Sequence, residues 1–208
     1  MEHLFLTNSD ALIIVDVQND FLPGGRLAVS QGDQAIPLLN RYIDFFVRSG
    51  QPVYATRDWH PANHCSFQPY GGIWPAHCVQ QSAGAQFAPN LALPAETVIV
   101  SKATTPEMDA YSGFEGTDLA GQVRARSIER LFVGGLATDY CVLNTVRDAL
   151  AQGFRVALLV DAIGAVDVYP GDGRKAIDEM TARGARPIRI SDIKERPSSR
   201  PVKTTVAG

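Results

Sequence analysis

Several features that direct a protein to a membrane or to nucleic acid are missing from this sequence of 208 residues. No run approaches the roughly 20 consecutive apolar residues of a transmembrane helix. The N-terminus, MEHLFLTNSD, lacks the basic start and the long apolar core of a signal peptide. The net charge is −3 and there is no basic run, so we expect neither nucleic acid nor an anionic membrane as a partner.

Cysteines are few, and their count is odd. Three cysteines give no disulfide framework, which predicts a cytoplasmic protein with reduced thiols. Phosphate-loop motifs are also missing, because Gly24-Gly25 and Gly134-Gly135 form neither a Walker A pattern nor a GxGxxG run. The content of 45% hydrophobic and 20% charged residues is typical of a globular protein. We expect one domain at 1–193 and a flexible tail at 194–208, which has few apolar anchors.

Apolar runs alternate with segments of helical periodicity along the chain. Strands are expected at 11–15, 52–56, 97–100, 131–133, 154–160 and 187–190. Helices are expected at 36–47, 117–126 (with Thr117 as its cap), 142–150 and 172–183. This alternation predicts an α/β fold, a three-layer α/β/α domain with a mostly parallel six-stranded sheet covered on both faces. Residues 61–95 show no sustained period, and a loop of this length usually builds a site.

The most informative stretch is Leu131-Phe-Val-Gly-Gly-Leu-Ala-Thr-Asp-Tyr-Cys-Val142. Its pattern predicts a buried strand, a turn that contains the glycines, and a helix whose first turn carries Cys141. The positive end of a helix dipole lowers a thiol pKa, and the free backbone N–H groups there can hold an oxyanion. Cys141 is therefore a candidate nucleophile. The alternative is that it is a small buried hydrophobic residue.

Four reactive side chains stand where predicted strands end: Asp16, Asp58, Lys102 and Cys141. In parallel sheets, ligands bind beyond the carboxyl ends of the strands. A cysteine nucleophile needs a base for its proton and a cation that favours the thiolate, and Asp16 and Lys102 are candidates for these two roles. Taken singly, Asp16 could cap a turn and Lys102 could be a solvated charge.

A second group lies in and beside the long loop: Asp58, His60, His64 and His77. Asp58 and His60 are two residues apart, which points both side chains the same way in an extended segment. A carboxylate with two or three imidazoles suits Zn²⁺, Fe²⁺ or Mn²⁺ and leaves positions open for water or substrate. The alternatives are surface histidines or a structural zinc site that includes Cys65 and Cys78. Packing cysteines are favoured over the structural zinc site.

Aromatic residues also gather near these loops: Phe21, Trp59, Phe67, Trp74, Tyr111 and Phe114. Each could simply pack a loop, but several at the mouth of a cleft would clamp a flat ring.

These segments together resemble a known family. The similar segments are Asp16-Val-Gln-Asn-Asp-Phe-Leu-Pro-Gly-Gly25, Asp58-Trp-His-Pro-Ala-Asn-His64, Trp74-Pro-Ala-His-Cys78, Lys102, Tyr111-Ser-Gly-Phe114 and Gly135-Leu-Ala-Thr-Asp-Tyr-Cys141. They resemble the nicotinamidases, also called pyrazinamidases, of the isochorismatase-like hydrolases, in order from about residue 11 to residue 190. The Asp-x-His and Trp-Pro-x-His-Cys segments are the most specific to the nicotinamidase branch.

The resemblance implies a role for each matching residue. Asp16, Lys102 and Cys141 match a catalytic triad, and the backbone N–H groups of Ala137 and Cys141 match an oxyanion hole. The peptide bond between Leu136 and Ala137 matches a cis bond in the family. Three positions match the metal ligands of the family: Asp58, His60 and His77. His64 matches a ligand that only some members have. Three positions match residues at the pyridine ring of the substrate: Phe21, Trp74 and Tyr111.

The activity that the resemblance implies is deamidation of nicotinamide to nicotinate and ammonia, in NAD salvage, through a thioester on Cys141. Pyrazinamide should also be accepted and give pyrazinoate. One divalent transition metal is implied, Zn²⁺ in the first place, with Fe²⁺ and Mn²⁺ as alternatives. The expected partner is the small-molecule substrate, and the oligomeric state stays open, a homo-oligomer included.

Three other interpretations stay open. A related amidohydrolase would act on a carbamoyl or ureido substrate with the same triad and without the metal ligands. A metal-bound water could be the nucleophile, as in zinc hydrolases. A metal-binding redox sensor would use the thiols of Cys65, Cys78 and Cys141.

Overall fold

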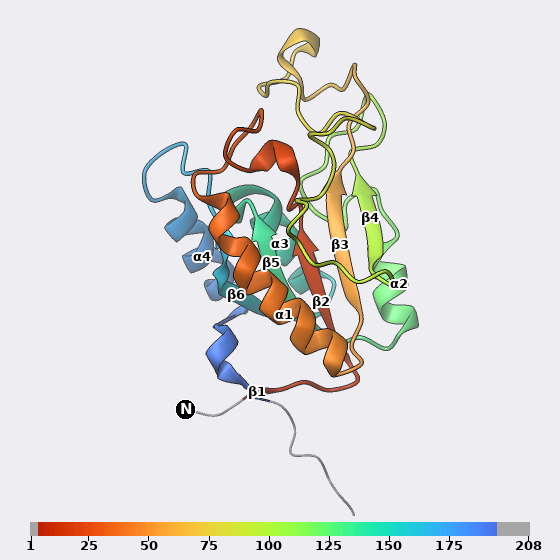
Figure 1. Cartoon of the computed structure of the whole chain (residues 1–208), viewed down its shortest axis with the longest axis vertical. Helices are drawn as coiled ribbons and strands as arrows, with labels where there is room; N and C mark the ends of the chain where they lie inside the picture. The colour runs from red at the N-terminus through yellow and green to blue at the C-terminus, as the bar shows by residue number, and fades with distance from the viewer. Residues whose placement is uncertain (1–3, 195–208) are drawn as a thin grey trace, which may run out of the picture.

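The computed structural model describes residues 4–194 and contains a six-stranded sheet in which every pairing is parallel. Its strand order is β4-β3-β2-β5-β6-β7 (Figure 1). The strands are β2 (Asp10–Val15), β3 (Val53–Asp58), β4 (Val98–Lys102), β5 (Arg130–Leu136), β6 (Arg155–Gly164) and β7 (Arg186–Ile188). The predicted α/β class with a parallel six-stranded sheet is confirmed.

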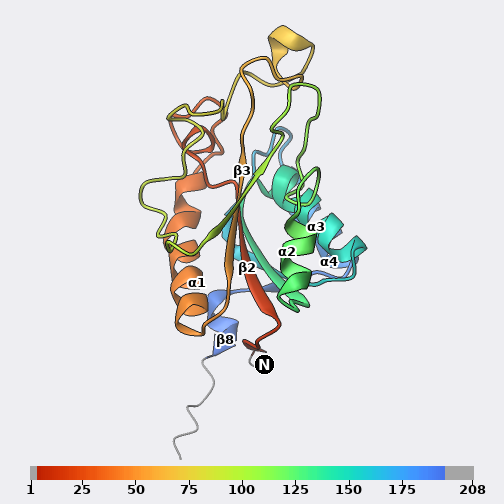
Figure 2. The same cartoon turned by 90° about the vertical axis from the view of Figure 1, so that its right-hand side faces the viewer.

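Helices cover both faces of the sheet, as predicted. The helices are α1 (Ile36–Arg48), α2 (Leu119–Ala125), α3 (Leu143–Ala151) and α4 (Asp172–Ala182). Figure 2 shows α1 alone on one face, with α2, α3 and α4 on the other. The central strand β2 is buried along its whole length because its alternate side chains enter two cores. Leu12 and Ile14 belong to the cluster beside α1, and Ile13 belongs to the opposite cluster.

The long loop between β3 and β4 has little regular structure, as its sequence predicts. Its only helical turn is a short 3₁₀ segment, Gln68–Tyr70. The loop lies beyond the carboxyl ends of β3 and β4, at the top of Figure 1. Isolated bridges pair His60 with Val79 and Phe67 with Trp74, so the loop folds back on itself.

Smaller elements differ from the sequence prediction. The N-cap of α2 is Asp118 and not Thr117. The Thr117 hydroxyl donates to the carbonyl oxygen of Gly113 and accepts the N–H of Leu119, the first residue of the helix, at 3.3 Å. A two-stranded parallel pair, β1 (Leu4–Phe5) with β8 (Ile193–Lys194), was not predicted, because strands of two residues carry no periodic signal. The predicted flexible tail lies outside the described residues, except for Lys194. No helix within residues 4–194 is long and apolar enough to cross a membrane.

The glycines of the central stretch lie in a strand and not in a turn, which corrects the sequence prediction. β5 continues through Gly134 and Gly135 to Leu136, with an irregular register beside β6 at this point. Gly135 has a φ of +122°, and a Cβ atom there would lie 2.2 Å from the carbonyl oxygen of Val15. Glycine is required because the backbones of β2 and β5 approach too closely for any side chain.

We expect Gly135→Ala to lower the free energy of unfolding by about 2–4 kcal/mol, because strain in φ adds to a clash with backbone. Gly153→Ala is the matched control, since Gly153 also has a positive φ (+88°) but has no heavy atom within 4 Å of a Cβ. Its cost should be about 1–2 kcal/mol. Chemical denaturation of both variants measures the difference, and equal losses would contradict the role of the close approach.

Candidate active site

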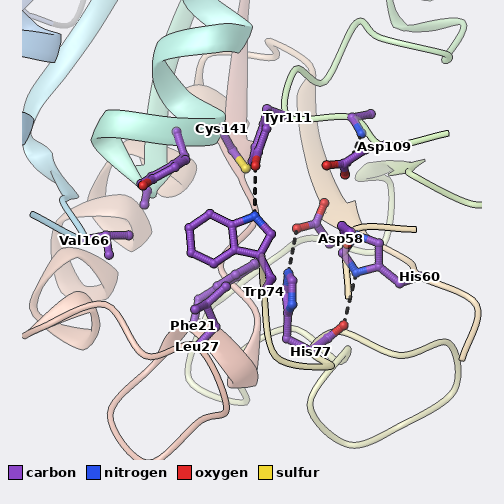
Figure 3. A pocket seen from close by; sticks show the side chains of 14 residues that line it. Phe21, Leu27, Asp58, His60, Trp74, His77, Asp109, Tyr111, Cys141 and Val166 are labelled. Atoms are coloured by element: carbon purple, nitrogen blue, oxygen red, sulfur yellow. Dashed lines mark hydrogen bonds and ion pairs between the residues drawn. The ribbon is translucent and has the colours of Figure 1, made fainter. Parts of the chain in front are cut away.

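The carboxyl ends of four neighbouring strands bring together the four reactive side chains predicted from the sequence. Asp16 directly follows β2, and Asp58 and Lys102 are register partners at the ends of β3 and β4. Cys141 lies in a π-helical turn, Thr138–Val142, which follows β5 and leads into α3. A pocket opens at this edge, and Figure 3 shows the 14 side chains that line it.

The buried ammonium of Lys102 contacts each of the other three groups. Its Nζ lies 2.9 Å from Asp16 Oδ2 and 3.5 Å from Cys141 Sγ, and it donates a short hydrogen bond to Asp58 Oδ1. It also donates to the carbonyl oxygen of Ala110, at 3.1 Å. The lysine therefore links a cysteine and carboxylate pair to a second carboxylate, Asp58, which belongs to the histidine group.

Burial and charge act against each other in this cluster. Burial opposes the charged form of Lys102, but Asp16 and Asp58 outweigh it and raise the pKa of the ammonium well above its usual value. The lysine is therefore a permanent cation. Burial raises the pKa of the Asp16 carboxyl, although Lys102 and a hydrogen bond from the Thr56 hydroxyl act in the opposite direction. A raised carboxyl pKa suits a group that accepts and returns a proton.

The thiol of Cys141 differs from the sequence expectation. Burial raises its pKa well above the usual value, and the nearby carboxylates add to this, while Lys102 only partly offsets them. The helix terminus was expected to lower the thiol pKa, but burial outweighs it, because the thiolate would be fully desolvated and would face two carboxylates. In the free protein the sulfur keeps its proton, so attack by Cys141 requires proton transfer to a neighbouring base.

Asp58, His60 and His77 form a buried group whose potential ligand atoms all lie within 4.8 Å of one another. Nδ1 of His60 donates to the carbonyl oxygen of His77 at 3.1 Å, and Nδ1 of His77 donates to that of Pro75 at 2.8 Å. Because a carbonyl oxygen only accepts, both Nδ1 atoms carry a proton, which leaves Nε2 of each ring as the atom that can bind a metal. His77 Nε2 lies 4.0 Å from Asp58 Oδ2 (Figure 3).

This donor set fits a divalent transition metal. Burial lowers the pKa of His60 to about 4, so its imidazole is neutral near pH 7. Two imidazoles whose Nδ1 atoms donate to backbone carbonyls are the usual arrangement of histidine ligands. Together with the carboxylate of Asp58, they offer three ligands and leave further positions open, as in catalytic zinc sites.

His64 lies beside this group and is already occupied. Its Nε2 donates to the carbonyl oxygen of Met108 at 3.1 Å, and its Nδ1 lies 2.7 Å from the hydroxyl of Ser66. The potential ligand atom of His64 lies close to those of His60 and Asp109, in a second possible metal-binding group that does not include Asp58 or His77. Within residues 4–194, no such group includes Cys65 or Cys78, so a structural zinc site built on these cysteines has no support.

Three aromatic residues line the pocket, as the resemblance implies: Phe21, Trp74 and Tyr111. Trp74 donates its indole N–H to the hydroxyl of Tyr111 at 2.9 Å, which fixes the indole between Cys141 and Phe21 (Figure 3). The other candidate aromatics lie outside the pocket lining: Trp59, Phe67 and Phe114. The flat, apolar walls suit an aromatic ring.

Sequence reasoning missed several residues of the pocket. Tyr140 packs edge-on against Trp74, with ring centroids 5.3 Å apart. The other lining residues that were not predicted are Leu27, Ser66, Asp109, Ala110 and Val166. Tyr140 directly precedes Cys141, which is the signal that could have pointed to it. Leu27 and Val166 come from loops whose path depends on tertiary contacts, so no local pattern indicates them.

Beside Cys141, the bond between Leu136 and Ala137 is cis, as the resemblance predicts, and Ala137 lines the pocket. The site thus brings a cysteine, a carboxylate and a lysine into contact at the carboxyl edge of a parallel α/β sheet, an arrangement that suits hydrolysis by a nucleophilic cysteine. A sequence model of the isochorismatase domain matches residues 10–192. The chain belongs to the isochorismatase family of hydrolases.

Known relatives within this family carry narrower names. The nicotinamidase of Escherichia coli K12 is 41% identical over 206 residues, which covers 89% of this chain and 97% of the relative. The pyrazinamidase of Pyrococcus horikoshii, solved in complex with zinc, has a TM-score of 0.84 and 50% identity, covering 87% of this chain and 99% of that one. PnC1 of L. infantum, solved in complex with nicotinate, has a TM-score of 0.83 and 37% identity over 93% of this chain and 100% of that one.

Proposed function

We propose that this protein is a nicotinamidase, which hydrolyses nicotinamide to nicotinate and ammonia and also accepts pyrazinamide. The observation that carries the proposal is the contact of Lys102 with Asp16, Asp58 and Cys141, which joins a nucleophile, a base and a metal-binding group in one aromatic pocket. The names of the relatives support the same substrate class. We place the reaction in NAD salvage and in the cytoplasm, where three free thiols stay reduced.

The chemistry begins with a proton transfer. The carboxylate of Asp16 takes the proton of the Cys141 thiol, and the sulfur attacks the amide carbon. The backbone N–H groups of Ala137 and Cys141 stabilise the oxyanion, an effect typically worth about 3 kcal/mol. Asp16 then gives its proton to the departing ammonia, which leaves a thioester on Cys141. Asp16 next takes a proton from water, whose oxygen attacks the thioester carbon. The C–S bond then breaks, which releases nicotinate, and Asp16 returns the proton to Cys141.

Lys102 keeps this cycle electrostatically balanced. Its ammonium stays within 3.5 Å of the sulfur and 2.9 Å of Asp16, so a negative charge on either group faces the same cation. The cluster can therefore move its negative charge from Asp16 to the sulfur and back without importing a counter-ion.

Asp58, His60 and His77 would hold one divalent metal, for which we propose Zn²⁺, with Fe²⁺ and Mn²⁺ as alternatives. When bound, the metal supplies a Lewis-acid position for the ring nitrogen of the substrate. Phe21, Trp74 and Tyr111 hold the two faces and the edge of the ring, so that the carboxamide meets Cys141 in one orientation. His64 is not needed as a ligand, because both of its ring nitrogens already have partners.

The direct test is ammonia release by the purified protein from nicotinamide and pyrazinamide. We expect turnover of both amides. Treatment with a chelator should lower the turnover rate by about 100-fold, since a misplaced ring costs about this much, and addition of Zn²⁺ should restore it. An N-carbamoyl amino acid is the control substrate and should not react. Ammonia from the carbamoyl compound alone would contradict the substrate, and full activity after metal removal, verified by elemental analysis, would contradict the metal.

A further inference from the structure

Two buried polar side chains near the site take no part in the proposed reaction. Gln18 is fully buried and Asp20 nearly so, and both follow Asp16 on the segment that leaves β2. Burying an amide or a carboxylate is costly unless its polar atoms are hydrogen-bonded. The partners of Gln18 and Asp20 therefore indicate what these side chains do.

All three hydrogen bonds of the Gln18 side chain go to backbone groups around the site. Its Oε1 accepts the N–H of Asp58 at 2.8 Å, and its Nε2 donates to the carbonyl oxygen of Asp58 at 2.8 Å. The second Nε2 proton goes to the carbonyl oxygen of Ala85 at 2.9 Å. The amide thus pairs with both backbone groups of Asp58, as a neighbouring strand would, beyond the point where β2 has ended.

Asp20 likewise binds a backbone group next to a potential metal ligand, in this case beside His77. Its Oδ2 accepts the N–H of Cys78 at 2.7 Å. Cys78 has a positive φ of +45° and immediately follows His77. The carbonyl oxygen of Cys78 in turn accepts the backbone N–H of His60 at 3.0 Å. The turn that Asp20 holds therefore contains His77 and is hydrogen-bonded to His60.

We propose that Gln18 and Asp20 are positioning residues that hold the backbones of Asp58 and of the His77–Cys78 turn at the separation which metal binding needs. The inference rests on the proposed metal site. Its physical basis is that Asp58 lies in β3 and His77 in a loop that one isolated bridge, His60 with Val79, ties to the end of β3. A pairing this short does not by itself fix the spacing of the ligands. Residues 16–20 would then contain both the proposed base, Asp16, and the two positioning residues. This one segment would fix the metal ligands relative to the base of the nucleophile Cys141.

The test measures the affinity for Zn²⁺ by competition with a chromogenic chelator, without any substrate. Gln18→Met and Asp20→Leu keep the volume and remove the hydrogen bonds, and each should weaken binding by about 10–100-fold. Asp20→Asn keeps an oxygen for the Cys78 N–H and loses only the longer bond that Oδ1 accepts from the Arg26 N–H, at 3.3 Å, so it should stay within about threefold of the wild type. If Gln18→Met does not fold, Gln18→Glu replaces it, because Glu cannot donate to the carbonyl oxygen of Asp58 and should weaken binding as well.

Asp10→Asn is the matched control. Asp10 is a fully buried carboxylate at the other end of β2, where it pairs with Arg130. This variant should lose stability and keep its Zn²⁺ affinity. Wild-type affinity in folded Gln18 and Asp20 variants, or an equal loss in Asp10→Asn, would overturn the positioning role. A wild-type protein that binds no Zn²⁺ would overturn the metal site itself, and this inference with it, whatever its activity on nicotinamide.

Discussion

Replacing Cys141 by alanine should slow ammonia release from nicotinamide by at least about 10⁴-fold. The sulfur is the only nucleophile in contact with both Lys102 and Asp16 among the pocket residues that the structure describes. In the proposed mechanism, the variant keeps the substrate-binding groups and the oxyanion site but has no atom that can accept the acyl group. Steady-state ammonia assays of the variant and the wild type measure the loss, and mass spectrometry of the quenched wild type should detect the thioester.

The control for this prediction is Cys65→Ala. Cys65 is partly buried, lies outside the pocket lining, and should tolerate the change with little loss of activity. The Zn²⁺ affinity of Cys141→Ala should stay close to that of the wild type, because its sulfur is not needed by the group of Asp58, His60 and His77. Turnover that survives in Cys141→Ala but disappears on chelation would move the nucleophile to a metal-bound water.

Lys102→Met should be the most destabilising change in the site, at about 3–5 kcal/mol. Methionine fills the space of the lysine stem but leaves the carboxylates of Asp16 and Asp58 buried without their common cation. Activity should fall as well, because nothing then balances the charge that moves between Asp16 and Cys141. Chemical denaturation and the kcat/KM for nicotinamide measure the two effects.

The instability of Lys102→Met should also depend on pH. Burial already raises the pKa of the Asp16 carboxyl, and without the cation this pKa rises further. The pKa of the Asp58 carboxyl, which burial would raise but Lys102 and the two histidines hold below its usual value, rises as well, whereas the unfolded chain ionises both carboxyls near pH 4. The folded state then binds more protons than the unfolded state, so the stability lost relative to the wild type grows as the pH rises above about 4. Lys175→Met is the control, because that side chain is 74% exposed and should change stability by no more than about 0.5 kcal/mol. A Lys102→Met protein as stable as this control would contradict the electrostatic account.

Much of the fold could be predicted from local patterns. Short buried apolar runs and helical periodicity indicated all six strands of the sheet and its four helices, because parallel sheets covered on both faces need such runs. The exceptions have physical causes. β5 runs on through Gly134 and Gly135, since only contact with β2 shows that these glycines belong to a ladder. β1 and β8 are too short to leave a pattern.

The candidate site divides in a similar way. The ends of the predicted strands indicated that Asp16, Asp58, Lys102 and Cys141 meet at one edge, and the structure brings them into contact. The raised thiol pKa could not be predicted, because it depends on how completely Cys141 is buried and on two carboxylates from other strands. The position of Val166 in the pocket could not be predicted either, because this residue lies in a loop far from the other lining residues in the sequence.

The sequence by itself determined the class of fold and which side chains stand at the carboxyl edge of the sheet, because hydrophobic periodicity and strand ends are local properties. Only the tertiary structure decided how these side chains are joined. The register between β3 and β4 sets Lys102 beside Asp58, and the path of residues 16–20 sets Gln18 against the backbone of Asp58. Distances and desolvation arise from packing between segments far apart in the chain, and these two quantities set the charges of the site.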